Sequence, residues 1–180
     1  AGKTTRVPLA LLDQPWLAGQ KLVLLEPRRL AARAAAAYMA ATLHEPVGRT
    51  VGYRIRHDTK VGPDTRIEVV TEGILTRLLQ HDPSLAGYGL VIFDEFHERS
   101  LQADLGLAFA RESQRVFRPD LRLLIMSATL DCAAVTRLLQ DAETISCEGR
   151  LFPVSTQYLH QPIEGRLEPA VVQSIRQALI

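Results

Sequence analysis

Short runs of apolar residues alternate with longer segments of helical periodicity, and this alternation constrains the fold more than any other feature of the sequence. The segment 21–27 (KLVLLEP) is an apolar run that ends in proline, which is typical of a strand buried on both faces. The segment 28–44 is rich in alanine and favours a helix. Strands that alternate with helices of about ten or more residues predict crossover connections and a mostly parallel sheet.

The same alternation continues through the rest of the sequence. Further strands are expected at 50–56, 66–71, 89–95, 121–129 and 143–149, with a turn at Gly62-Pro63, and further helices at 72–82, 101–116, 131–140 and 167–180. We therefore predict an α/β fold with helices on both faces of the sheet, as one domain at 1–150 followed by a connector at 151–180. In such sheets, ligands bind beyond the carboxyl ends of the strands.

Composition excludes some classes of protein and leaves others open. A chain of 180 residues with 47% hydrophobic and 23% charged residues suits one well-buried globular domain, and no apolar stretch is long enough to span a bilayer. Cys132 and Cys147 suggest reduced thiols in a cytosolic protein. Residues 1–66 carry a net charge of +6 and residues 67–180 a net charge of −5. This asymmetry suits either a surface that faces a polyanion or an uneven solvated surface.

The strand expected at 89–95 ends in two adjacent carboxylates, Asp94 and Glu95. Carboxylates at the end of a buried strand are costly unless a cation meets them, and a hydrated Mg²⁺ that carries a nucleoside triphosphate would do so. In this interpretation Asp94 holds the metal through water, and Glu95 accepts a proton from the water that attacks the γ-phosphate. A helix N-terminus with acidic residues in its first turn remains the alternative.

The first residues, Gly2-Lys3-Thr4, match the closing half of the phosphate-loop pattern G-x-x-x-x-G-K-[ST]. By itself this match also suits an ordinary tripeptide before a helix. Ser127 and Thr129 place small hydroxyl groups where the strand at 121–129 emerges. Their hydroxyls either hydrogen-bond the carboxylates and relay their state, or cap the helix that follows.

Two further strand-to-helix junctions carry groups that suit phosphates. Arg28 and Arg29 open the helix at 28–44, where cations are mildly unfavourable unless an anion is present. We favour contacts to nucleic-acid phosphates over a solvated helix start. Thr71, Glu72 and Gly73 occupy the second junction, where free backbone N–H groups can bind a phosphate.

Taken in order, these segments resemble a known family. GKTT (2–5), EPRRLAAR (26–33), VVTEGIL (69–75), DEFH (94–97) and SAT (127–129) resemble motifs I, Ia, Ib, II and III of superfamily 2 helicases of the DEAH/RHA branch. The form DEFH, with VGYRIR upstream and EFHERSLQADLGLAF following, is similar to the bacterial HrpB-type ATP-dependent helicases. The resemblance extends over nearly the whole chain, up to EGRLFPV at 148–154.

The resemblance implies the first RecA-like P-loop NTPase domain of a helicase, truncated within motif I, with ATP and Mg²⁺ as cofactors. Lys3 would reach the β- and γ-phosphates and the Thr4 hydroxyl would ligate Mg²⁺, with Gly2 and Thr5 completing the nucleotide-binding segment.

His97, together with Ser127 and Thr129, would couple the nucleotide state to the neighbouring domain, although a histidine in a turn also suits a plain surface position. Arg28, Arg29 and Thr71 would contact the nucleic acid.

The implied activity is ATP hydrolysis coupled to translocation on single-stranded RNA, 3′ to 5′, in the bacterial cytoplasm and without a membrane. The residues themselves leave DNA open as the nucleic acid. A second RecA-like domain would supply arginine fingers, and no segment like QRxGRxGR occurs here, so we expect this fragment to hydrolyse ATP barely or not at all.

Two alternatives from other functional classes remain. One is a P-loop ATPase that remodels duplex DNA or protein without unwinding RNA. The other is a non-catalytic nucleic-acid-binding module, against which the intact Asp94 and Glu95 count.

Overall fold

The computed structural model describes residues 2–128, 132–139, 142–146, 153–156, 158 and 165–179, with backbone only for 132–134. The chain divides into two compact units, Ala1–Ile145 and Ser146–Ile180. The strands are β1 (Lys21–Leu25), β2 (Val51–Ile55), β3 (Asp58–Lys60), β4 (Ile67–Val70), β5 (Tyr88–Phe93) and β6 (Arg122–Ile125). The helices are α1 (Lys3–Leu11), α2 (Arg29–Thr42), α3 (Glu72–His81), α4 (Leu101–Val116), α5 (Cys132–Leu138) and, in the second unit, α6 (Leu167–Ala178), with short 3₁₀ helices η1 (Pro15–Leu17) and η2 (Phe96–Glu98).

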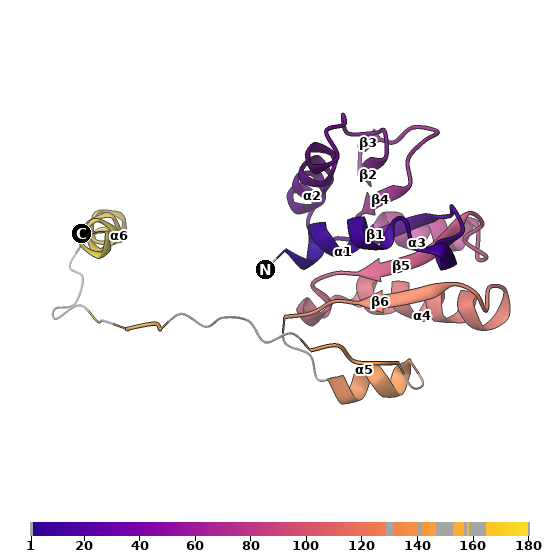
Figure 1. Cartoon of the computed structure of the whole chain (residues 1–180). Helices are drawn as coiled ribbons and strands as arrows, with labels where there is room; N and C mark the ends of the chain where they lie inside the picture. Colours follow the sequence, from indigo (N-terminus) through magenta and orange to yellow (C-terminus); the bar gives the residue numbers. More distant parts are fainter. Residues whose placement is uncertain are drawn as a thin grey trace. The chain divides into compact units, whose positions relative to one another are not determined.

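The first unit is built on one six-stranded sheet with the order β3-β2-β4-β1-β5-β6 (Figure 1). All neighbouring strands pair in parallel except β2 and β3, which are antiparallel. The predicted α/β fold with a mostly parallel sheet is therefore confirmed. Parallel pairing aligns the carboxyl ends of the central strands at one edge, because Leu25 is in register with both Val70 and Phe93.

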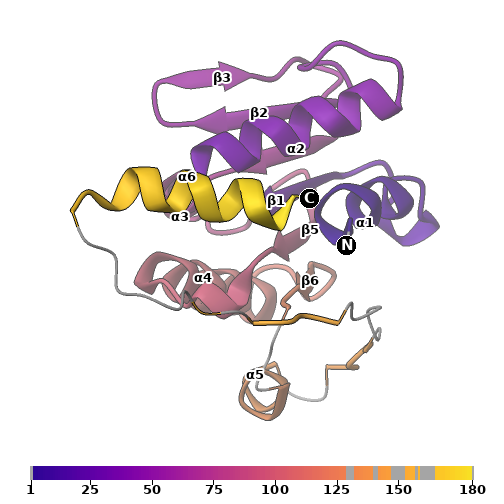
Figure 2. The same ribbon diagram turned by 90° about the vertical axis from the view of Figure 1, so that its left-hand side faces the viewer.

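The sheet separates two hydrophobic cores, as expected where helices cover both faces. Along β1, Leu22 and Leu24 belong to one core, and Val23 and Leu25 belong to the other. Helices α1 and α2 cover the first core and α3 and α4 cover the second. Figure 2 shows α1 and α4 on opposite sides of β5.

The structure corrects the sequence prediction in two places. The turn at Gly62-Pro63 is present, but β3 lies between it and β2, and a Cβ at Gly52 would collide with the carbonyl oxygen of Lys60 on β3. The strand expected at 143–149 is wrong over 143–146, which have no regular secondary structure and are exposed. The rest of that segment, including Cys147, lies outside the described residues. β3 was missed because it consists of three polar residues without the apolar alternation that marks a strand.

Candidate functional site

The polar residues that follow the central strands lie together at the carboxyl edge of the sheet. Asp94 follows β5, and its backbone N–H donates to the carbonyl of Leu25 at 3.0 Å. Glu26 follows β1, and its N–H donates to the carbonyl of Val70 at 2.9 Å. The ends of β1, β4 and β5 are thus joined by hydrogen bonds one residue beyond the strands themselves.

Asp94 is only 4% exposed, and its two carboxylate oxygens differ in their contacts. Oδ1 accepts a hydrogen bond from the N–H of Glu95 at 2.9 Å. Oδ2 is buried and has no hydrogen-bond partner among the described residues. A buried carboxylate oxygen without a partner is rare in folded proteins and needs a water or a cation. This oxygen therefore fits the predicted Mg²⁺ site.

The donor set at this edge suits a cation that keeps most of its water. Among the described residues, no group of three or more His, Cys, Asp and Glu side chains is arranged to hold a metal ion. Mg²⁺ differs from zinc in this respect, because it retains several waters and binds through one or two carboxylates together with substrate phosphates.

A second buried carboxylate, Glu26, lies beside Asp94 and was missed in the sequence. It is 4% exposed. Burial raises the pKa of Glu26 to about 7, the negative charge of Asp94 adds to this effect, and Glu95 and Glu98 contribute less. The signal was an acidic residue at the end of the apolar run 21–25, the same pattern that drew attention to Asp94.

Glu95 and His97 form the next layer of the site. Glu95 has φ +47°, in the left-handed region, and so turns the chain out of β5 into η2. Its Oε2 lies 3.3 Å from Nδ1 of His97. The N–H of Ala128 also points at this nitrogen, at 3.4 Å. One ring nitrogen cannot donate to Glu95 and accept from Ala128 at the same time, so His97 has two alternative partners.

Lys3 reaches the same edge from the start of α1. Its Nζ donates to the carbonyl oxygen of Ser127 at 2.5 Å. Ser127 follows Met126, whose N–H donates to the carbonyl of Phe93 at 2.8 Å. The lysine and the end of β5 are thus brought to one edge of the sheet, as the nucleotide-site prediction requires.

The first turn of α1 is placed to present backbone N–H groups. Gly2 precedes the helix with φ +88° and provides no side-chain cap. Thr4 and Thr5 are half-buried in this first turn. Of the two expected coupling hydroxyls, Ser127 is half-buried beside Lys3, whereas Thr129 lies outside the described residues.

The predicted nucleic-acid residues lie along the same edge, and two of their side chains have partners within the chain. Nη2 of Arg28 lies 2.6 Å from Oε1 of Glu98. Nη2 of Arg29 donates to the carbonyl of Arg56 at 3.0 Å.

The second junction is tied to the segment after η2. Thr71 precedes α3 with an extended backbone, and the carboxylate of Glu72 accepts a hydrogen bond from the hydroxyl of Ser100. Gly73 is exposed, and a Cβ added there would have no other atom within 4 Å. The start of α3 is therefore joined to Ser100, the N-cap of α4, two residues after η2.

A domain with this sheet order, and with acids, a hydroxyl residue and a helix-start lysine at its carboxyl edge, is a RecA-like NTPase domain. Residues 1–138 match the DEAD/DEAH box helicase family, and the chain belongs to that family. The resemblance inferred from the motifs is thereby confirmed.

Individual relatives agree with this assignment. The chain is 54% identical over 179 residues to ATP-dependent RNA helicase HrpB of Escherichia coli (strain K12). The aligned region is 99% of this chain and 22% of that protein. It is 36% identical over 158 residues to the ATP-dependent RNA helicase HrpA homolog of Haemophilus influenzae, and this aligned region is 88% of this chain and 12% of that protein. The chain thus spans about a fifth of the length of the HrpB relative and a smaller share of the length of the HrpA homolog.

Solved structures give the same result. The crystal structure of the Escherichia coli DEAH/RHA helicase HrpB superposes with a TM-score of 0.88 at 53% identity, over 98% of this chain and 23% of that one. A second crystal structure, of the E. coli DExH-box NTPase HrpB, gives a TM-score of 0.81 at 53% identity, over 99% and 22% of the two chains. Among the described residues, no helix has both the length and the apolar character needed to cross a bilayer.

Proposed function

We propose that this chain is the first RecA-like domain of an HrpB-type ATP-dependent RNA helicase, and that its carboxyl edge binds and hydrolyses ATP. The observation that carries the proposal is the buried Oδ2 of Asp94, which has no partner among the described residues. The similarity to HrpB of E. coli supports the choice of substrate.

In this proposal the nucleotide lies between the start of α1 and the end of β5. Asp94, through water, and the Thr4 hydroxyl hold Mg²⁺, which neutralises charge on the β- and γ-phosphates when bound. The ammonium of Lys3 exchanges the carbonyl of Ser127 for phosphate oxygens. Glu95 is 41% exposed and can reach the attacking water to accept its proton.

The remaining site residues bind the phosphates, relay the nucleotide state or contact the nucleic acid. Gly2 and Thr5 contribute backbone N–H groups of the first turn to the phosphates. His97, Ser127 and Thr129 relay the nucleotide state to a second RecA-like domain. Arg28, Arg29, Thr71, Glu72 and Gly73 line the track for single-stranded RNA, along which the protein moves 3′ to 5′.

The isolated domain should be nearly inactive, since the arginine fingers of such enzymes come from the second domain and contribute about 10³–10⁵ in rate in related phosphoryl-transfer enzymes. We propose that residues 1–150 form the ATP-binding domain and residues 151–180 the connector towards that second domain. Vigorous RNA-stimulated turnover by residues 1–180 alone would contradict this part of the proposal.

The test uses Glu95→Gln in the full-length protein that contains this chain. We expect ATP hydrolysis to fall by about 10²–10⁴-fold, because a positioned general base is lost, while ATP still binds. Phosphate release and nucleotide binding are measured in parallel. Glu112→Gln, on the exposed side of α4, is the matched control and should hydrolyse ATP normally.

Unchanged hydrolysis by Glu95→Gln would remove Glu95 from its role. The wild-type protein is also assayed with single-stranded RNA and with duplex DNA. Stimulation by RNA supports the helicase assignment, whereas stimulation by duplex DNA alone supports a remodelling ATPase.

A further inference from the structure

The contact between Arg28 and Glu98 joins two segments that are far apart in the sequence. Arg28 immediately precedes α2, after β1, and Glu98 ends η2, after β5. Because β1 and β5 are neighbours in the sheet, the two side chains meet at the carboxyl edge, with Nη2 of Arg28 2.6 Å from Oε1 of Glu98. The pair thus links the proposed RNA track to the turn that carries Glu95 and His97.

Glu98 belongs to a turn that is held firmly. The side chain of Phe96 is 4% exposed and packs edge-on against Phe93, with ring centroids 6.2 Å apart. The N–H of Phe96 donates to the carbonyl of Met126 at 3.1 Å, and the guanidinium of Arg99 lies over the Phe96 ring at 5.6 Å. The carboxylate of Glu98 therefore occupies a defined place beside the strand ends.

Arg28 is held much less firmly than its neighbour Arg33. Its side chain is 72% exposed, and its contact with Glu98 is a single hydrogen bond. Arg33, by contrast, pairs with Asp58 through two nitrogens, lies 5.8 Å from the Tyr53 ring centroid, and shares Asp58 with the Tyr53 hydroxyl. Arg28 can thus leave its partner at little cost, whereas Arg33 cannot.

Glu98 is one of several acids near Glu26. Its charge and those of Asp94 and Glu95 all act on Glu26. Arg28 pairs with one member of this group, Glu98. A nucleic-acid phosphate approaching Arg28 presents several anionic oxygens to a guanidinium that can bind two of them at once, so phosphate and Glu98 compete for the same donors.

We propose that Glu98 is an internal competitor of RNA: its carboxylate occupies Arg28 in the free protein, and a backbone phosphate must displace it. The contact therefore lowers RNA affinity and ties occupancy of the RNA track to the DEFH turn. This inference rests on the proposed function, and specifically on Arg28 as a phosphate contact.

The test is a double-mutant cycle in the full-length protein, with fluorescence anisotropy of a labelled single-stranded RNA of mixed sequence at fixed salt. We expect Glu98→Gln to bind RNA about two- to five-fold more tightly, the factor by which an exposed ion pair shifts an equilibrium. The RNA concentration for half-maximal ATPase stimulation should fall by the same factor. Arg28→Gln alone should weaken binding.

The decisive arm is Glu98→Gln in the Arg28→Gln background. A general loss of negative charge near the RNA would strengthen binding in both backgrounds, whereas competition for Arg28 strengthens it only when Arg28 is present. We therefore expect no gain in the double variant. Glu112→Gln, which removes an exposed acid paired with Arg115 on α4, controls for net charge and should leave RNA affinity unchanged.

An equal gain in both backgrounds, no gain with Glu98→Gln, or unaltered binding by Arg28→Gln would overturn the inference while the proposed function stands on the wild-type assay. If the wild-type protein neither binds single-stranded RNA nor is stimulated by it, the proposed function itself fails, and the inference fails with it. Thermal unfolding of each variant verifies that these exposed charge-to-amide changes leave the fold intact.

Discussion

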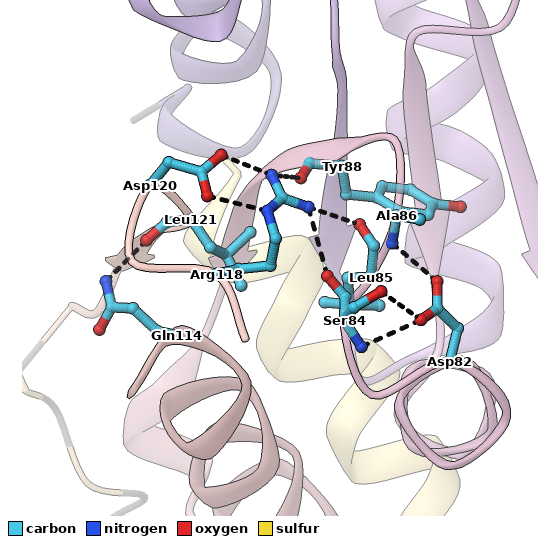
Figure 3. A network of polar contacts seen from close by, with 9 residues as sticks. All are labelled: Asp82, Ser84, Leu85, Ala86, Tyr88, Gln114, Arg118, Asp120 and Leu121. Atoms are coloured by element: carbon cyan, nitrogen blue, oxygen red, sulfur yellow. Dashed lines mark hydrogen bonds and ion pairs between the residues drawn. The ribbon is translucent and has the colours of Figure 1, made fainter. Parts of the chain in front are cut away.

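At the amino edge of the sheet, a single arginine has all its donors engaged, whereas at the carboxyl edge a buried carboxylate oxygen has no partner among the described residues. Figure 3 shows the first arrangement: Nη1 of Arg118 donates to the carbonyls of Ser84 and Leu85, and Nη2 donates to that of Tyr88. Nε and Nη2 also bind the two carboxylate oxygens of Asp120 at 2.8 and 2.7 Å.

The same network fixes the turn that leads into β5. Oδ1 of Asp82 accepts hydrogen bonds from the N–H and hydroxyl of Ser84, and its Oδ2 accepts one from the N–H of Ala86 (Figure 3). The turns before β5 and β6 are thus joined by one guanidinium. Saturated hydrogen bonding of this kind stabilises a loop and offers little to a ligand.

Two buried glutamates, one on β4 and one directly after the neighbouring strand β1, show the same contrast. Glu68 on β4 is fully buried, and its carboxylate accepts from Lys21 at 3.0 Å, from Arg54 at 2.7 Å and from the Tyr88 hydroxyl at 3.0 Å. Burial favours its neutral form, but the hydrogen bonds from Arg54 and Lys21 outweigh this, and the pKa of Glu68 is lowered. Glu26, one residue beyond β1, is instead affected by burial and by the charges of nearby acids, and its pKa is raised to about 7.

Charged groups thus stabilise this domain at some positions and destabilise it at others. Charges that are satisfied within the chain stabilise the fold, and charges left unsatisfied are available to an external cation or anion at a cost in stability. Substitutions that remove charge should therefore destabilise the domain around Glu68 and Arg118, and should stabilise it around Glu26.

The largest effect on stability is expected for Glu68→Ala. The change leaves Lys21 and Arg54 without their carboxylate, and breaking a buried ion pair typically costs about 3–5 kcal/mol. Because each cation is 35% exposed and can be partly hydrated, we expect a loss of about 3 kcal/mol. Hydrogen–deuterium exchange of the β1 and β4 amides in the full-length protein measures it.

Glu112→Ala is the matched control for this change, because it removes an exposed acid and should shift the same exchange by no more than about 0.5 kcal/mol. A loss below about 1 kcal/mol for Glu68→Ala would mean that the buried network contributes little, since that is no more than an ordinary hydrogen bond contributes. The statement that the ion pairs of Glu68 stabilise the fold would then be wrong.

A smaller effect, and one of opposite sign, is expected for Glu26→Gln. The carboxyl titrates at about 7 in the folded state against 4.5 when unperturbed. Its contribution to stability is therefore full below pH 4.5 and is lost as the pH rises towards 7. Glutamine removes this penalty, so the variant should be more stable than wild type at pH 8 by about 2 kcal/mol, at ~1.4 kcal/mol per pKa unit and with allowance for solvent at this edge.

Thermal unfolding of the metal-free protein across the pH range checks this prediction. The difference should vanish below pH 4.5, where both side chains are neutral. Glu68→Gln is the internal comparison: because the pKa of Glu68 is lowered, its stabilisation is present above 4.5 and is lost as the pH falls. That variant should therefore be less stable than wild type at pH 8, and identical pH profiles for the two variants would contradict the contrast.

The sequence was sufficient to predict the α/β fold and the order of its helices and most strands, and to single out the strand ends where the candidate site lies. It was insufficient for side-chain pairings that depend on which strands are neighbours in the sheet. Helix α4 was predicted with its observed bounds because its periodicity is strong, and the structure shows that Ser100 caps its first turn. The charge interaction of Asp94 with Glu26 and the hydrogen bond of Arg28 with Glu98 depend on which strands are neighbours, and local patterns do not specify that order. The partners of Glu68 come from three different strands and could not be predicted from the sequence for the same reason.

The smallest effect is expected for Arg118→Lys, which keeps the charge but replaces a planar fork by a single ammonium with three donors. The ammonium cannot bind both oxygens of Asp120 and also reach the carbonyls of Ser84, Leu85 and Tyr88. Because those carbonyls lie at the edge of the sheet, water replaces part of what is lost, and we expect a loss of about 1 kcal/mol. Amide exchange over residues 82–88 measures it, with Arg115→Lys on the exposed side of α4 as the control. An equal response to both changes would show that the fork at the amino edge adds nothing beyond its charge.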